Sequence, residues 1–211
     1  MSTVRPATRR FSILLALVVA SAVGTTAGSA SPTSFPGPAG KIAITLVSSG
    51  TEEPGIRVMN PDGSGLTRIP AAGGFQPVWS ADGRWLAYTT FPNPWVIRVV
   101  RADGTGDREV LSASSGAPAT TSGYTWSPTG AEIAYRCATG LCAVRVSDGT
   151  TRRILDVPSR IFVASPAWSP DGSRIAFACS VGVGLCLVNA DGTNVVGFAS
   201  QPGFRLQSPD W

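Results

Sequence analysis

The residues best suited to chemistry in this 211-residue chain are four cysteines, which fall into two close pairs. Cys137 and Cys142 flank one short segment, and Cys179 and Cys186 flank another. Each segment has the pattern of a hairpin tip, where directly opposed Cα atoms lie about 4.5–5.5 Å apart, within disulfide range. The even number and local pairing predict two hairpin disulfides. The alternative is a zinc site, which requires all four thiolates to converge from two separate hairpins.

The chain contains no histidine, so Ser-His-Asp and Cys-His catalytic arrangements are impossible. Any acid–base chemistry would fall to carboxylates, but most aspartates precede a glycine between apolar runs, a pattern typical of tight turns. A calcium site needs about six to eight converging oxygen ligands, and no single loop offers more than one or two carboxylates. We therefore expect no catalytic residue, no metal and no cofactor. The aspartates interpreted as turn residues are Asp62, Asp82, Asp103, Asp148, Asp171 and Asp191.

These turns belong to a longer repeat that is marked by tryptophan. Trp79, Trp126, Trp168 and Trp211 follow one another at intervals of 47, 42 and 43 residues. After each of the first three come a short turn, an apolar run, a hairpin, a second apolar run and an Asp-Gly-Thr turn. A fixed period in the forties indicates one supersecondary unit repeated along the chain. Short strands with turn signals at this density predict an all-β fold, a small β-propeller in which each unit is a four-stranded blade.

The expected strands follow from alignment of the four units. In the fourth unit we expect one strand ending at Trp168 and others over 174–178, 185–188 and 194–198. The equivalent strands are 85–88, 96–100 and 108–111 in the second unit, 132–135, 142–146 and 152–155 in the third, and 41–45, 56–59 and 66–69 in the first. No helical periodicity is present after the first thirty residues.

The first unit lacks a first strand and its tryptophan, and the missing piece has a counterpart in residues 204–211. If this C-terminal strand pairs with residues 41–45, four blades close into a ring without an open sheet edge. The closed ring predicts a monomer. The alternatives are a fragment of a larger ring, or a partial ring that pairs with another copy as a homodimer.

The first thirty residues have the pattern of a secretory signal peptide. Three arginines precede an apolar run of 13 residues, 11–23, and small residues follow it. That run is shorter than the roughly 20 residues of a membrane-spanning helix, so we expect no stable membrane insertion after the signal is removed. Residues 31–40 are rich in proline, glycine and serine and read as a flexible linker. The propeller domain is then 41–211, in an exported protein that is periplasmic, cell-envelope or extracellular.

Charge gives little indication of a partner. The leader contains three arginines and no acidic residue, which leaves 14 basic and 13 acidic residues in the rest of the chain. A net charge this close to zero gives no electrostatic reason to expect nucleic-acid binding.

One family resembles this repeat. The pattern Pro166-Ala-Trp168-Ser-Pro-Asp-Gly172, followed by Ile175-Ala-Phe177 and a second apolar strand, is similar to the WD40-like PD40 repeats. These repeats form the propellers of periplasmic TolB proteins and of some peptidases of the prolyl oligopeptidase type. The resemblance covers residues 41–211 and implies a non-catalytic scaffold that engages a protein or another cell-envelope ligand. It departs from the family in length, since TolB implies a six-bladed ring behind a further domain, and at Thr129, where the repeat has aspartate.

Two loops without counterparts in the other units give the candidate binding face. Phe91 and Trp95 flank the tip of the second unit's hairpin, and Arg160 and Phe162 lie in the long connection between the third and fourth units. Aromatic side chains on a proline-braced tip are suited to protein recognition. The alternatives in function are a small hydrolase or lyase that uses carboxylates at the propeller channel, and a remnant of a larger propeller protein.

Overall fold

The computed structural model describes residues 40–47, 53–70, 73–90, 96–112, 123–157, 163–179, 184–199 and 209–211. Contacts divide the chain into Met1–Ser31 and Pro32–Trp211, and every described residue belongs to the second unit. The predicted signal peptide, 1–30, and all of the predicted linker except Gly40 lie outside the described residues. In the described part of the chain, no helix has the length and apolar character needed to cross a bilayer.

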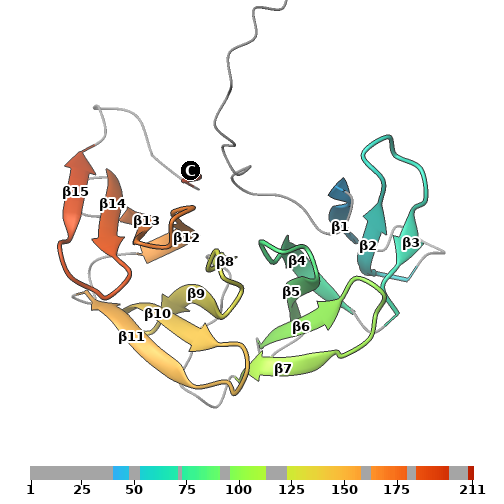
Figure 1. The fold of residues 1–211 in the computed structure, drawn as a ribbon, viewed down its shortest axis with the longest axis horizontal. Helices are drawn as coiled ribbons and strands as arrows, with labels where there is room; N and C mark the ends of the chain where they lie inside the picture. Colours follow the sequence, from blue (N-terminus) through green and yellow to red (C-terminus); the bar gives the residue numbers. More distant parts are fainter. Residues whose placement is uncertain are drawn as a thin grey trace, which may run out of the picture. The chain divides into compact units, whose positions relative to one another are not determined.

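The described strands form antiparallel sheets, one for each sequence unit (Figure 1). The first sheet contains β1 (Ile42–Leu46), β2 (Gly55–Met59) and β3 (Thr67–Arg68). The second contains β4 (Gly74–Trp79), β5 (Trp85–Thr90), β6 (Ile97–Arg101) and β7 (Arg108–Leu111). The third contains β8 (Tyr124–Trp126), β9 (Glu132–Cys137), β10 (Gly140–Arg145) and β11 (Thr151–Asp156), and the fourth β12 (Val163–Trp168), β13 (Arg174–Cys179), β14 (Gly184–Asn189) and β15 (Val196–Ala199). The all-β repeat predicted from the tryptophan spacing is confirmed.

The turn after each tryptophan is built around a buried serine. Ser80, Ser127 and Ser169 are 2%, 5% and 3% exposed. In the fourth sheet, Ser169 Oγ donates to Asp171 Oδ1 over 2.6 Å and accepts the backbone N–H of Arg174 over 2.9 Å. Hydrogen bonds from Ser169 and Ser173 lower the pKa of Asp171 to about 2. The aspartate therefore serves as a permanently charged acceptor for the turn, as its position before glycine predicted.

The third sheet has a weaker version of this turn because Thr129 replaces the aspartate. The Thr129 hydroxyl lies 3.3 Å from Ser127 Oγ and accepts the Ala131 N–H over 3.4 Å. In the second sheet the corresponding Asp82 bonds measure 2.6 Å from Ser80 Oγ and 3.0 Å from Arg84 N. A neutral hydroxyl at longer distances makes weaker bonds than a carboxylate does.

Neighbouring sheets pack face to face, and each of the three core clusters is shared by two sheets. Successive side chains of a strand point to opposite faces, so each central sheet buries both faces. In β5, for example, Leu86 and Tyr88 pack with the first sheet, whereas Ala87 packs with the third. Between the second and third sheets, Trp126 Nε1 donates to the carbonyl of Val78 over 3.0 Å. Trp79 and Trp168 also pack in the cores that they share with the preceding sheet, but within the described residues their Nε1 atoms have no hydrogen-bond partner. Trp126 therefore adds a hydrogen bond to packing that all three tryptophans share.

The structure does not show the ring closure predicted from the C-terminal segment. The first sheet has three strands, and within the described residues β1 pairs only with β2. Residues 204–208 lie outside the described part, and 209–211 are in no strand. The Trp211 Nε1 donates to the carbonyl of Ala167 in the fourth sheet over 3.0 Å, as Trp126 Nε1 does to Val78 in the second sheet.

Two disulfides bridge the β9–β10 and β13–β14 hairpins. Cys137 is bonded to Cys142 and Cys179 to Cys186, the pairs that flank the hairpin tips. All four cysteines of the sequence are accounted for, and none is free. The four thiols therefore do not form the alternative zinc site.

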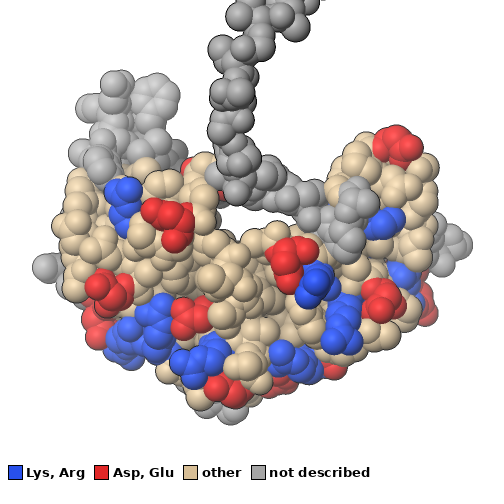
Figure 2. Space-filling model, in the orientation of Figure 1, with Lys and Arg blue, Asp and Glu red and all other residues tan. Residues whose placement is uncertain are grey.

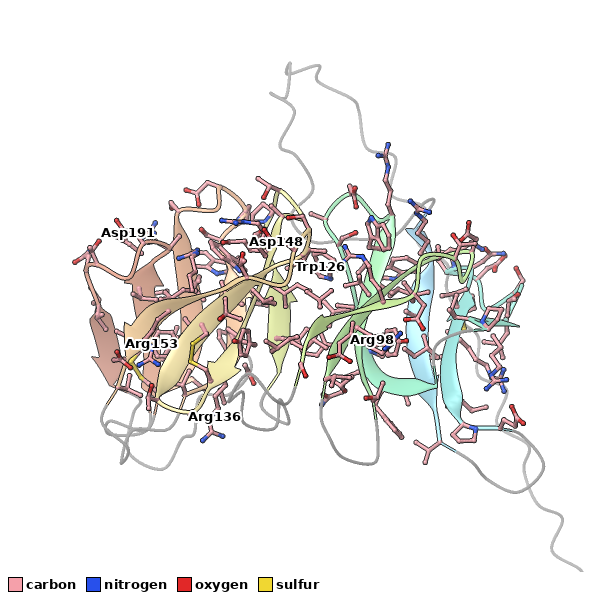
Figure 3. The ribbon with its side chains drawn as sticks, turned by 90° about the horizontal axis from the view of Figure 1, so that it is seen from below. Arg98, Trp126, Arg136, Asp148, Arg153 and Asp191 are labelled. Carbon is pink, nitrogen blue, oxygen red and sulfur yellow. A yellow bond between two sulfur atoms is a disulfide. The ribbon has the colours of Figure 1, made fainter. Side chains whose placement is uncertain are left out.

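Partly buried ion pairs support the sheets at their outer strands. Arg152 donates to both carboxylate oxygens of Glu132, over 2.9 and 2.7 Å, and its third nitrogen donates to the carbonyl of Ala190 in the next sheet over 2.9 Å. In the second sheet, Arg98, which is labelled in Figure 3, makes a similar bidentate contact with Asp107, over 3.1 Å in both bonds. Such bidentate pairs fix both direction and distance.

The turn comparison predicts that Thr129→Asp stabilises the protein. The new carboxylate should accept the Ser127 hydroxyl and the Ala131 N–H as Asp82 and Asp171 do, which replaces two long bonds with charge-assisted ones. We expect a rise in the thermal midpoint of about 2–4 °C, measured by circular dichroism. Thr129→Val is the control that keeps the shape and removes both bonds, and it should lower the midpoint. An unchanged or lower midpoint for Thr129→Asp would contradict the assigned role of the turn aspartate.

The Glu132–Arg152 pair predicts a pH-dependent contribution to stability. The Arg152 hydrogen bonds lower the pKa of Glu132 from its ordinary value of 4.5. The stabilisation is therefore complete above that ordinary value and disappears as the pH falls through the lowered pKa. In urea titrations, wild type should be more stable than Glu132→Gln at pH 7, and the difference should shrink toward zero at about pH 3. A difference that stays constant between these values would show that the charge of Glu132 contributes nothing.

Candidate binding site on the first strands

The first strands of three sheets share an unusual backbone position, three residues before the tryptophan. Gln76, Gly123 and Ser165 occupy it, with φ of 56°, 83° and 48°. In β4 and β12 the register shifts at this point, so that Gln76 and Pro77 face the single residue Tyr88, and Ser165 and its proline face a single residue likewise. Such a bulge leaves backbone groups outside the ladder and bends the strand. A left-handed φ at a non-glycine residue costs about 1–3 kcal/mol and often marks a functional position.

Contacts between sheets connect these positions. The Gln76 N–H donates to Thr45 Oγ1 of β1 over 3.1 Å. The hydroxyl of Tyr124, on β8, donates to the Gln76 carbonyl. A Cβ added at Gly123 would lie 3.3 Å from the Ser165 Cα, so the third and fourth sheets are in close contact at the same level. Thr45, Gln76, Gly123, Tyr124 and Ser165 therefore form a continuous line across four sheets, which we call the bulge row.

The side chains of the bulge row are polar and uncharged. Gln76 is exposed, and Thr45 and Ser165 are half-buried. Tyr124 is buried, and its burial raises the pKa of the phenol, so its hydroxyl remains a hydrogen-bond donor at any physiological pH. The row can supply an amide, hydroxyls and bulge backbone groups to a ligand, and it offers no acid, base or nucleophile of perturbed reactivity.

The bulge row lies toward the end of the sheets where the predicted binding loops emerge. Gly74 pairs with Thr90, the last residue of β5, directly before residues 91–95. In the fourth sheet, β12 begins at Val163, directly after residues 158–162. Phe91, Trp95, Arg160 and Phe162 themselves lie outside the described residues, so the structure does not place their side chains. Their described neighbours, Thr90 and Val163, lie at the end of the sheets that carries the bulge row.

The Asp-Gly turns lie at the opposite end of the sheets. Figure 3 shows Asp148 and Asp191 at one end and Arg136 and Arg153, near the hairpin disulfides, at the other. Each turn aspartate accepts hydrogen bonds from its own turn, as Asp148 does from Thr150 N over 2.9 Å and from Thr150 Oγ1 over 2.6 Å. In the part of the chain that the structure describes, no group of three or more acidic residues and cysteines is placed to hold a metal ion.

The charged side chains on the visible surface do not form a patch of a single sign that would favour a strongly charged partner. In Figure 2, acidic and basic side chains are interspersed across the visible face. A groove of about 380 Å³ between β7 and the third sheet's Asp-Gly turn repeats the mixture, with Arg108, Glu109 and Asp148 in its wall. Neither feature resembles a nucleic-acid surface, which gathers basic residues into one patch.

Sequence reasoning missed the bulge row. A residue before proline is usually driven toward extended backbone, so Gln76 and Ser165 gave no sign of a left-handed conformation. The signal was present in the third unit, where the aligned residue is Gly123, the residue type that adopts positive φ without strain.

Comparison with known proteins supports the fold. Neither known protein families nor curated proteins gave a match. Among solved structures, the chain is similar to a protein assigned as TolB from Agrobacterium tumefaciens, with a TM-score of 0.60, 19% identity, and coverage of 74% of this chain and 60% of that one. It is also similar to a chain of the nidogen/laminin complex, with a TM-score of 0.55, 14% identity, and coverage of 69% and 56%.

A third similar structure is oligogalacturonate lyase from Vibrio parahaemolyticus, with a TM-score of 0.53, 13% identity, and coverage of 71% of this chain and 44% of that one. The chain spans less than two thirds of each of these three proteins. Identities at this level establish the architecture and leave activity open. The chain has a TolB-like β-propeller fold.

Proposed function

We propose that this chain is an exported, non-catalytic binding scaffold that engages a protein or another cell-envelope ligand. The observation that carries the proposal is the bulge row, a line of strained, uncharged polar groups on the first strands. Thr90 and Val163, the described neighbours of the segments that contain Phe91, Trp95, Arg160 and Phe162, lie at the same end of the sheets and support these four residues as part of the binding face. Rigid sheets that present variable loops are a common arrangement for recognition.

Export is supported by two independent features. Both hairpin disulfides require an oxidising compartment to form and persist. The first thirty residues also have the order of a secretory signal peptide. The resemblance of the repeat to periplasmic TolB proteins, together with the similarity to the Agrobacterium tumefaciens structure, favours the cell envelope as the compartment.

Binding is favoured over catalysis by the state of the carboxylates. A general acid needs a raised pKa, but hydrogen bonds from the turns lower the pKa values of Asp82, Asp103 and Asp148. Glu132 and Asp107 are engaged with arginine. The lyase among the similar structures shares the fold alone, whereas the nidogen/laminin complex is an example of a propeller of this kind in a protein assembly.

The proposal predicts that Trp95 is a binding hot spot. Purified wild type and Trp95→Ala would each be incubated with envelope extract, cross-linked and recovered, and the bound proteins would be quantified by mass spectrometry. We expect recovery of a specific partner to fall at least about tenfold for Trp95→Ala, because truncating a tryptophan anchor costs roughly 2 kcal/mol or more.

The matched control is Arg145→Ala, beside Asp148 in the Asp-Gly turn at the other end of the sheets. This variant should recover the partner as wild type does. Equal recovery with Trp95→Ala would remove the loop from the proposed site. Turnover of an envelope polysaccharide or peptide that is lost on substitution of a described carboxylate would overturn the non-catalytic assignment.

A further inference from the structure

In the described part of the chain the first sheet has three strands, and a hydrophobic residue is exposed where a fourth strand would lie. Ile42 of β1 aligns with Leu86, Ile133 and Ile175, each of which pairs with a first-strand tryptophan. Those three residues are 0% exposed, whereas Ile42 is 39% exposed. An unpaired strand edge with an exposed apolar side chain is a template for another strand.

The C-terminal segment has the sequence of the missing strand. Ser208-Pro-Asp-Trp211 aligns with Ser165-Pro-Ala-Trp168, which ends β12. Its tryptophan already makes the contact with the preceding sheet that Trp126 makes: Trp211 Nε1 donates to Ala167 O over 3.0 Å, just as Trp126 Nε1 donates to Val78 O. Trp211 nevertheless remains 39% exposed, against 6% for Trp126 and 9% for Trp168. Residues 209–211 therefore contact the fourth sheet through Trp211 and, in the described structure, belong to no strand.

The alignment also fixes the register of the missing pair. Val78 and Trp79 pair with Ala87 and Leu86, and the third and fourth sheets repeat this register. Asp210 should therefore face Ala43, and Trp211 should face Ile42. This pairing would cover the two exposed apolar side chains with each other.

Within the described residues, no strand pairs with the outer edge of β1. Residues 209–211 and β1 are both described, yet 209–211 are in no strand and β1 pairs only with β2. Four sheets closing alone must also turn more sharply from sheet to sheet than those of larger propellers. The similar structures are larger, since this chain covers 60% and 56% of the TolB and nidogen/laminin chains.

We propose that the C-terminal strand of one chain completes the first sheet of a second copy. Two copies related by a two-fold axis would form two identical junctions, so that each chain gives one strand and receives one. Both junctions bury an Ile42–Trp211 pair, and neither chain retains a bare β1 edge. The assembly is then a ring of sheets shared by two chains.

Cysteine cross-linking tests this directly. Ala43→Cys and Asp210→Cys are prepared as separate single variants, mixed, and oxidised, because directly opposed residues in antiparallel strands lie within disulfide range. The expected result is a two-chain product on a non-reducing gel in the mixture and in neither variant alone. Thr67→Cys, on β3 at the far side of the first sheet, replaces Ala43→Cys as the control and should give no such product.

The double variant Ala43→Cys/Asp210→Cys distinguishes exchange between chains from closure within one chain. A two-chain product supports the proposal, and an internal bond that leaves the chain running as a single chain overturns it. Light scattering should give twice the mass of one chain for wild type and the mass of one chain for Trp211→Ala. Val195→Ser, at an exposed valine directly before β15, should keep the doubled mass. A wild type with the mass of one chain would also overturn the proposal.

Discussion

The contact on which this fold depends is the packing of each repeat's tryptophan against the preceding sheet. A single four-stranded sheet of this size cannot bury both faces, and its strands are too short to be stable alone. Trp126 is buried between two sheets and bonds through its indole nitrogen to the carbonyl of Val78, so it fixes both the distance and the level at which the sheets meet. Trp211 repeats the bond at Ala167. Each repeat of the sequence therefore corresponds to one sheet packed on the sheet before it.

Most of the strands could be predicted from the sequence because their signals are local. Asp-Gly turns and alternating apolar residues place strands such as Arg108–Leu111 and Arg174–Cys179 to within a residue or two. The cysteine pairs followed from the same hairpins. Ring closure could not be predicted in this way. The C-terminal segment can pair with β1 of its own chain or with β1 of a second chain, and the repeat sequence is the same in both cases.

The candidate site was harder to predict than the fold. The loops with Phe91, Trp95, Arg160 and Phe162 were identified only because they interrupt the repeat, and they remain predictions. The positive φ of Gln76 and Ser165 depends on contacts between sheets, which no single unit encodes. The Arg98–Asp107 and Arg152–Glu132 pairs likewise join residues 9 and 20 positions apart whose identities differ from unit to unit. The residues that recur in every unit predict the scaffold, and the residues that differ between units indicate the candidate binding site.

The central claim is that the indole of Trp126 links the third sheet to the second, and the hydrogen exchange of its Nε1 proton tests this most directly. The Nε1 proton of Trp126 would be followed by NMR after transfer to deuterated water and assigned through Trp126→Phe. A proton bonded to the Val78 carbonyl should exchange only when the sheets separate, and Trp126→Phe should lower the free energy of unfolding by about 1 kcal/mol. Exchange of Trp126 as fast as that of a free indole, in a protein that remains folded, would contradict the account.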